Sequence, residues 1–142
     1  MKENQIDNNS IAYISLVQGV LNRMASVSAT FKGFSATAFA GVVAIVIATE
    51  ANGKVWAFLC ALVAVVVFAL FDWYYFYQEK QYRLLYEKIL SGEKECDFNL
   101  LPPKYDEISP LKALKSFSLW AFYGVLLVAL VVFVLLAATG VI

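Results

Sequence analysis

Residues 55–77 read VWAFLCALVAVVVFALFDWYYFY, a run that contains a single charged side chain. Hydrocarbon offers no partners to backbone N–H and C=O groups, so such a run crosses a bilayer as an α-helix, which needs about 20 apolar residues. Residues 117–142 form a second long run, and residues 34–49 form a shorter one that Phe31 and Gly33 extend. The sequence therefore predicts an all-α integral membrane protein with three transmembrane helices.

Basic residues are distributed unevenly around these three runs. Ten of the eleven Lys and Arg residues lie before the first run or between the second and third, and only Lys54 lies between the first and second. Basic segments stay in the cytoplasm. We therefore expect the N-terminus and the middle segment inside and the C-terminus outside, with the first two spans forming a hairpin that long cytoplasmic helices extend.

The whole chain, residues 1–142, is expected to form one membrane domain. An amphipathic helix runs into the first span over residues 10–49. The second span runs into a cytoplasmic helix over residues 55–90. A cytoplasmic loop over residues 92–110 then leads to the third span, which is expected as one helix over residues 111–142.

The composition argues against several kinds of site. The 142 residues include no histidine, two cysteines and equal numbers of acidic and basic residues. The commonest general base and metal ligand are therefore missing, and the charge balance is not that of a nucleic-acid-binding protein. The sequence also has no phosphate-binding loop and no nucleophile–base motif. We expect no enzyme activity, no catalytic, cofactor or metal site, and no nucleic-acid partner.

Apolar residues recur before the first run at alternating intervals of three and four, which is typical of a heptad seam. A helix that is apolar outside the bilayer requires something to cover it. Three alternatives stay open: another helix of the same chain, a neighbouring subunit, or the membrane interface. The seam comprises Ile14, Val17, Leu21, Met24, Ser28 and Phe31.

Small residues recur along the first run at a spacing of four. Helices in lipid associate through close backbone approach, which small residues allow. The partner is either the second run or an identical helix of another subunit, and the short turn that follows favours the second run slightly. The expected packing residues are Gly33, Ala36, Thr37, Ala40, Gly41, Ala44 and Ala48, together with Leu21 and Met24 of the seam.

Asp72 is the only acidic residue inside an expected span. An ionisable residue at membrane depth is a candidate functional site by default. Asp72 lies close to the cytoplasmic end of its span, where pairing with Lys32 or Arg23 is the simpler interpretation and ion handling at a pore mouth is the alternative. Further along, Glu79 and Arg83 have the spacing of an i,i+4 ion pair.

Two polar motifs resemble a known bacterial family. The first is Gln18-x-x-Leu21-x-Arg23-Met24-Ala25 followed by Lys32, and the second is Asp72-x-Tyr74-Tyr75-x-x-x-Glu79-x-x-x-Arg83-x-x-Tyr86. Over residues 14–90 they resemble the RipA family of octameric inner-membrane proteins. The chain departs from that family at Ser26-Val27-Ser28, where Asn-Ser is expected, and in its third run. The motif residues taken as an interfacial polar network are Gln18, Arg23, Lys32, Asp72, Tyr75, Glu79, Arg83 and Tyr86.

The resemblance implies a homo-oligomeric ring, an octamer in that family, in the bacterial cytoplasmic (inner) membrane. Some CRISPR-linked relatives are pore-like and depolarise the membrane during anti-phage defence. Our first hypothesis is accordingly a multi-pass pore or membrane-permeability effector that responds to an unknown protein or small-molecule trigger. The alternative is a non-conducting oligomeric scaffold that organises partner proteins or lipids. In both, the expected partners are further copies of the chain and membrane lipids.

Overall fold

The structure is a computed structural model that describes residues 8–48, 51–99, 101 and 103–139. These residues form helices and connecting segments, with no strand among them. Three of the helices, α1, α2 and α4, are long and apolar enough to cross a membrane. The all-helical class and the three candidate spans agree with the sequence prediction. The helices are α1 (Asn8–Ala48), α2 (Ala51–Leu90), α3 (Pro110–Leu114) and α4 (Phe117–Ala138).

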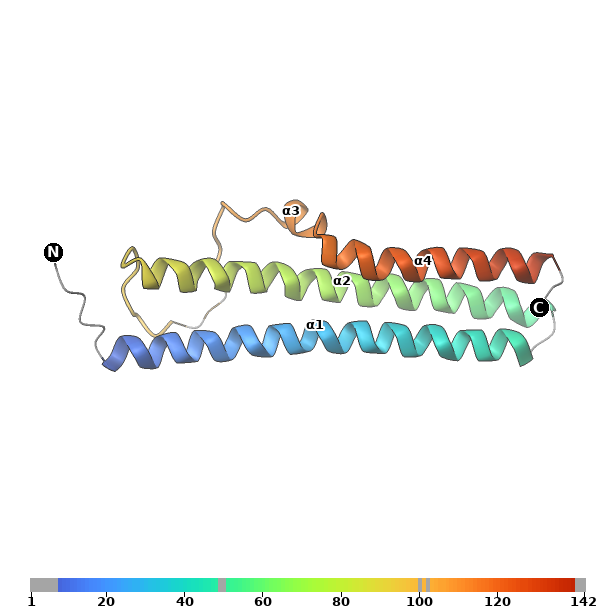
Figure 1. Ribbon diagram of the computed structural model, residues 1–142, viewed down its shortest axis with the longest axis horizontal. Coiled ribbons are helices and arrows are strands. Elements are labelled where there is room, and N and C mark those ends of the chain that lie inside the picture. The colour runs from blue at the N-terminus through green and yellow to red at the C-terminus, as the bar shows by residue number, and fades with distance from the viewer. Residues whose placement is uncertain (1–7, 49–50, 100, 102, 140–142) are drawn as a thin grey trace.

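The three long helices lie side by side along one axis (Figure 1). α1 and α2 run antiparallel along nearly their whole lengths, and α4 lies against α2 on the other side. The rings of Phe58 in α2 and Phe133 in α4 lie 6.1 Å apart, and the Tyr123 hydroxyl of α4 donates to the Phe68 carbonyl of α2. α4 is therefore antiparallel to the first half of α2, and it also contacts α1.

The helices differ in length in a way that divides the molecule into two ends. α4 has 22 residues and is about 33 Å long, close to the thickness of the hydrocarbon layer. α2 has 40 residues and is about 60 Å long. We call the part of α1 and α2 that continues beyond α4, residues 8–27 and 77–90, the extended end. Described residues between 91 and 109 pass over it (Figure 1).

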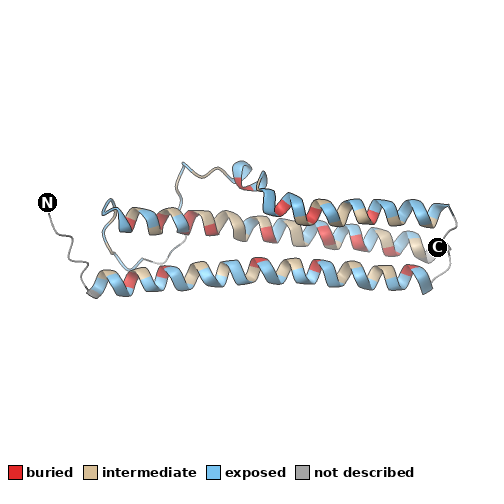
Figure 2. Cartoon of the chain, viewed as in Figure 1, coloured by how far each residue is buried: buried red, intermediate tan, exposed pale blue. Residues whose placement is uncertain are grey.

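Buried residues follow the facing sides of the helices, as Figure 2 shows. At the extended end, Tyr13 and Val17 of α1 pack against Tyr82, Leu85 and Ile89 of α2. Ile14, Leu21 and Met24 border this cluster. The heptad seam of α1 is therefore covered by a helix of the same chain, one of the three partners that the sequence leaves open.

The stripe of small residues on α1 does not face α2. All seven residues of the stripe are exposed, whereas Ser28, Ser35 and Val46 are the α1 residues buried at this level. At about 100° per residue, these two sets lie on opposite sides of the helix. Aromatic rings fill much of the α1–α2 contact instead, with Phe31 against Phe68, Phe71 and Tyr75. α2, the partner that the sequence favoured slightly, therefore does not cover the stripe, and packing of the stripe against another copy stays a prediction.

Two helix boundaries differ from the sequence prediction. α2 begins at Ala51, four residues before the expected start, so most of the expected turn is helical. The third span is not one helix from residue 111, because Ser116 is extended (φ −63°, ψ 133°) and separates α3 from α4. The hydrophobicity of the sequence alone does not reveal this break between α3 and α4. Gly92, with φ 76°, ends α2 where the sequence predicts it, and the positive φ suits a residue without a Cβ.

Candidate functional site

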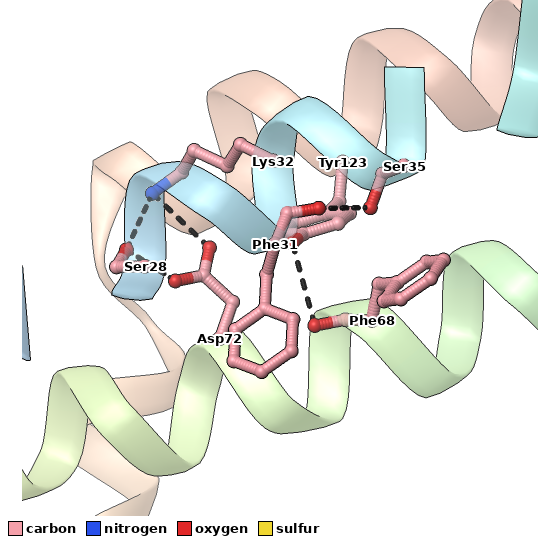
Figure 3. A network of polar contacts seen from close by, with 7 residues as sticks. All are labelled: Ser28, Phe31, Lys32, Ser35, Phe68, Asp72 and Tyr123. Carbon is pink, nitrogen blue, oxygen red and sulfur yellow. Dashed lines mark hydrogen bonds and ion pairs between the residues drawn. The ribbon is translucent and has the colours of Figure 1, made fainter. Parts of the chain in front are cut away.

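Asp72 is fully buried between α1 and α2, at the level where α4 begins its contact with α2 (Figure 3). The hydroxyl of Ser28 donates a hydrogen bond to Asp72 Oδ1. The ammonium of Lys32 lies 3.1 Å from Asp72 Oδ2 and donates to Ser28 Oγ at 3.0 Å. The three side chains thus form a closed triangle of polar contacts that joins the two helices.

Helix geometry explains why Ser28 and Lys32 reach the same carboxylate. The two residues are four positions apart on α1, so they lie on neighbouring turns of one face. Oδ2 of Asp72 receives no hydrogen bond from the described residues and is held by the charge of Lys32. The Lys32 side chain is 23% exposed and the Asp72 side chain 0%. The pair therefore has its carboxylate inside the helix contact and its ammonium at the rim.

Aromatic rings and two further hydroxyl groups surround this triangle. The Phe31 ring stacks on Phe71 with centroids 5.5 Å apart. One turn further along α1, the buried Ser35 hydroxyl donates to the Phe31 carbonyl at 2.8 Å, and Figure 3 shows Tyr123 beside it. The Tyr123 hydroxyl donates to the Phe68 carbonyl at 3.3 Å and also lies close enough to Asp72 and Ser35 to interact with both side chains. A low-dielectric surrounding strengthens the attraction within the pair.

The extended end contains a second group of polar contacts, built around the buried Gln81. Its amide nitrogen donates to the Tyr77 hydroxyl at 2.9 Å and to the Tyr105 carbonyl at 3.3 Å. Its amide oxygen accepts a bond from the Tyr105 backbone N–H at 2.8 Å. One side chain thus bonds both backbone groups of Tyr105 and holds the segment after α2 against that helix.

A matching contact ties the same segment to α1. The hydroxyl of Tyr13 donates to Asp97 Oδ1 at 3.1 Å and to the Asn99 carbonyl at 3.0 Å. The Asn99 backbone N–H, the Tyr13 hydroxyl and the nearby Lys94 together hold the pKa of Asp97 below its usual value. The carboxylate is therefore charged in this contact and accepts from both donors.

The eight residues expected as a polar network form separate contacts rather than one connected set. Besides the Lys32–Asp72 pair, Gln18 donates to the Tyr86 hydroxyl at 3.0 Å, and Arg83 pairs with Glu79 at 2.6 Å. Tyr75 packs on the Phe31 ring. Arg23 is exposed and makes no ion pair among the described residues, so it is Lys32 that pairs with Asp72.

Three structural residues were not identified from the sequence: Tyr13, Gln81 and Tyr123. Tyr13 and Gln81 bond to segments 24 to 86 residues away along the chain, so no local pattern reveals them. Tyr123 lies in an apolar run, and its hydroxyl among aliphatic residues was the one sequence signal that it needs a hydrogen-bond partner. Within the described part of the chain, no group of three or more His, Cys, Asp or Glu side chains is arranged to hold a metal ion.

The chemistry of the Asp72 site is charge pairing between two helices. No family model, curated protein sequence or solved structure matches this chain. The resemblance to the RipA family is thus carried by the two polar motifs alone.

Proposed function

We propose that this chain is one protomer of a homo-oligomeric ring in the bacterial inner membrane, and that the ring is a pore or membrane-permeability effector. The observation that carries the proposal is the exposed stripe of small residues on α1. Packing through small residues is how helices associate in lipid. The stripe has no partner among the described residues, and a Cβ added at Gly33 or Gly41 would meet no atom within 4 Å.

The opposite outer side of the protomer has a different character. The exposed residues of α4 are large and apolar, such as Trp120, Val125, Val128 and Leu135. Large aliphatic side chains suit contact with acyl chains, whereas small ones suit contact with another helix. We therefore orient α1 toward the other copies and α4 toward lipid.

The exposed face of α1 also supports a conducting function. Toward the extended end, the stripe is continued by Ser15, Gly19, Asn22, Ser26 and Thr30, all of them exposed. In a ring where one edge of this face contacts the next copy and the other edge borders the central axis, the axis has a polar entrance at one end and a narrow constriction lined by Ala and Gly residues at the other. A narrow apolar constriction gates by dewetting, which suits an effector that stays closed until it is triggered.

The proposal includes an orientation. Basic residues follow the cytoplasmic side, so the extended end lies in the cytoplasm and the Ala48 and Ala138 ends of α1 and α4 lie outside. The resemblance to the RipA family supports an octamer and a role in anti-phage defence, with a protein or small molecule as the trigger.

The first test is the mass of the detergent-solubilised complex compared with the 15.8 kDa chain. We expect a ring several times heavier than the chain, and a shift to the single protomer in Gly41→Leu, which places a bulky side chain on the stripe. Ala121→Leu is the matched control, because Ala121 is exposed on α4. A wild-type complex of one chain would overturn the oligomer, and an unchanged mass in Gly41→Leu would overturn the stripe as its interface.

The second test is ion flux through vesicles that contain the full-length protein, measured as loss of a potassium diffusion potential. A pore predicts collapse of the potential in the presence of the trigger, and a smaller effect in Thr37→Leu. Between Gly33 and Ala48 only Thr37 adds a polar group to the exposed stripe, and this favours the alternative of a non-conducting scaffold. An intact potential together with a stoichiometric bound partner would select the scaffold.

A further inference from the structure

An apolar groove of about 160 Å³ opens between α2 and α4, next to α3. Its lining includes Ala69 and Trp73 of α2 and Leu119, Trp120 and Leu127 of α4. Gly124 also lines it, and a Cβ at that position would meet no atom within 4 Å. The groove is therefore a hollow along the contact between α2 and α4, and the absence of a side chain at Gly124 leaves it open.

The short helix α3 is held at one end of this groove. The indole N–H of Trp73 donates to the Pro110 carbonyl at 3.0 Å, and Ala113 is fully buried against the rest of the chain. Leu114, the last residue of α3, lines the groove itself. These contacts fix the position of the α3 side chains relative to the groove.

Two basic residues on this segment have no carboxylate partner among the residues that the structure describes. Lys112 and Lys115 are exposed and take part in no ion pair among the described residues. Lys32, Lys88 and Lys94, by contrast, each lie within 4 Å of a carboxylate oxygen. The positive charge that the chain leaves unneutralised at this level is therefore adjacent to the apolar groove.

We propose that the groove and these two lysines form a binding site for an anionic phospholipid. The phosphate is held by Lys112 and Lys115, and one acyl chain lies in the groove against Gly124. Trp73 and Trp120 flank the acyl chain at the level that indole rings occupy in membrane interfaces. Basic residues beside a membrane attract anionic headgroups, and an apolar groove next to them distinguishes a specific site from general attraction.

The site does not depend on the proposed pore. It requires only that α2, α3 and α4 of one protomer pack as described, and it lies on the side of the molecule away from the α1 stripe. A protomer that fails to form a ring can therefore still bind the lipid. The two proposals are separated by measuring complex mass and lipid binding on the same variants.

Tryptophan quenching by brominated lipids tests the site. The full-length protein with Trp56→Phe, which removes the one tryptophan outside the groove, is reconstituted in vesicles of phosphatidylcholine containing increasing brominated phosphatidylglycerol. We expect stronger quenching than with brominated phosphatidylcholine at the same mole fraction. Higher ionic strength should weaken this preference, and soluble glycerol 3-phosphate should not abolish it, because the acyl chain contributes to binding.

Two pairs of variants complete the test. Lys112→Gln with Lys115→Gln should lower the preference for the anionic lipid about 25-fold, or about fivefold for each lysine, whereas the control Lys104→Gln, at an exposed loop lysine, should leave it unchanged. Gly124→Leu should fill the groove and reduce quenching at saturating lipid, and the control Ala121→Leu should not.

Equal quenching by anionic and neutral lipid in the wild type would overturn the proposal, since the groove would then be ordinary lipid-facing surface. An unchanged preference in the double lysine variant would also overturn it. Displacement by glycerol 3-phosphate alone would show a phosphate site without an acyl chain, which contradicts the role assigned to the groove.

Discussion

Removing Lys32 should destabilise the protein more than removing Asp72. The Lys32→Met variant leaves the Asp72 carboxylate buried, with the hydrogen bond from Ser28 but without its counter-ion. Breaking a buried ion pair in this way costs about 3–5 kcal/mol. The Asp72→Asn variant leaves the ammonium of Lys32, which is already 23% exposed. That ammonium reaches water or lipid headgroups, so the loss is about 1.5–3 kcal/mol, the range for a hydrogen bond to a charged group.

The double variant Lys32→Met with Asp72→Asn should recover much of the loss. It removes both charges, and the amide that replaces the carboxylate keeps a hydrogen bond with Ser28. Replacing a buried pair by neutral groups of similar volume is often close to neutral in stability. The interaction between the two sites should then offset a large part of the Lys32→Met penalty, by about 1–3 kcal/mol.

Equilibrium unfolding in mixed micelles, followed by circular dichroism, measures these differences. Lys104→Met is the control for loss of a positive charge, because Lys104 is exposed in the loop. If Lys32→Met behaves like Lys104→Met, the buried carboxylate does not depend on its ammonium. If Asp72→Asn costs more than Lys32→Met, the argument from unequal burial is wrong.

Three further predictions concern the extended end. Gln81→Leu removes both bonds to the Tyr105 backbone and should loosen residues 103–108 by about 1–3 kcal/mol; faster amide exchange there, with α1 unchanged, is the measurement, and unchanged exchange would contradict the clamp. The pKa of Asp97 is lowered chiefly by the Asn99 N–H, so its contact stabilises the protein at pH values above the usual pKa of 3.8. This stability is lost as the pH falls through the lowered pKa. An NMR titration midpoint at or above pH 3.8 would refute this, and Tyr13→Phe should raise the midpoint. Gly92→Ala places a Cβ at φ 76° and should cost about 1 kcal/mol in thermal unfolding, whereas no loss would argue against the positive φ.

The three candidate spans and the ion pairing of Asp72 could be predicted because each depends on local properties. Hydropathy over about 20 residues identifies a span wherever it packs. The pairing of Asp72 with a basic residue of α1 follows from the cost of a lone charge at membrane depth. Which residue pairs could not be predicted, because Lys32 and Arg23 both lie before the first run. The rotation of α1 decides it: Lys32 shares a face with Ser28, and Arg23 does not.

For a similar reason, the sequence could not predict the direction in which the stripe of small residues faces. Periodicity shows which residues share a face of a helix but not what lies opposite that face. The short turn favoured α2 as the partner, yet α2 meets α1 through Phe31 and Ser28. The clamps made by Tyr13 and Gln81 were equally hidden, since they bond to an irregular segment that has no repeating pattern.

Lys32 and the stripe lie on different faces of α1, so the rotation of α1 about its axis sets the position of both. A rotation of α1 by one residue, about 100°, would carry Ser28 and Lys32 away from Asp72 and turn part of the stripe toward α2. The apolar contacts between the helices are less selective, because apolar side chains tolerate exchange and rearrangement. We infer that the buried pair sets the rotation of α1 and so keeps the stripe on the outside.

The double variant Lys32→Met with Asp72→Asn separates this role from stability. Its helices should remain packed, but without the charge pair the rotation of α1 is less strictly defined. We expect a complex of broader mass distribution than the wild type, at an unfolding free energy between those of Lys32→Met and the wild type. A single complex of unchanged mass would show that the apolar contacts alone set the rotation. In that case the pair would serve stability, and the orientation of the stripe would follow from the packing of rings such as Phe31 against α2.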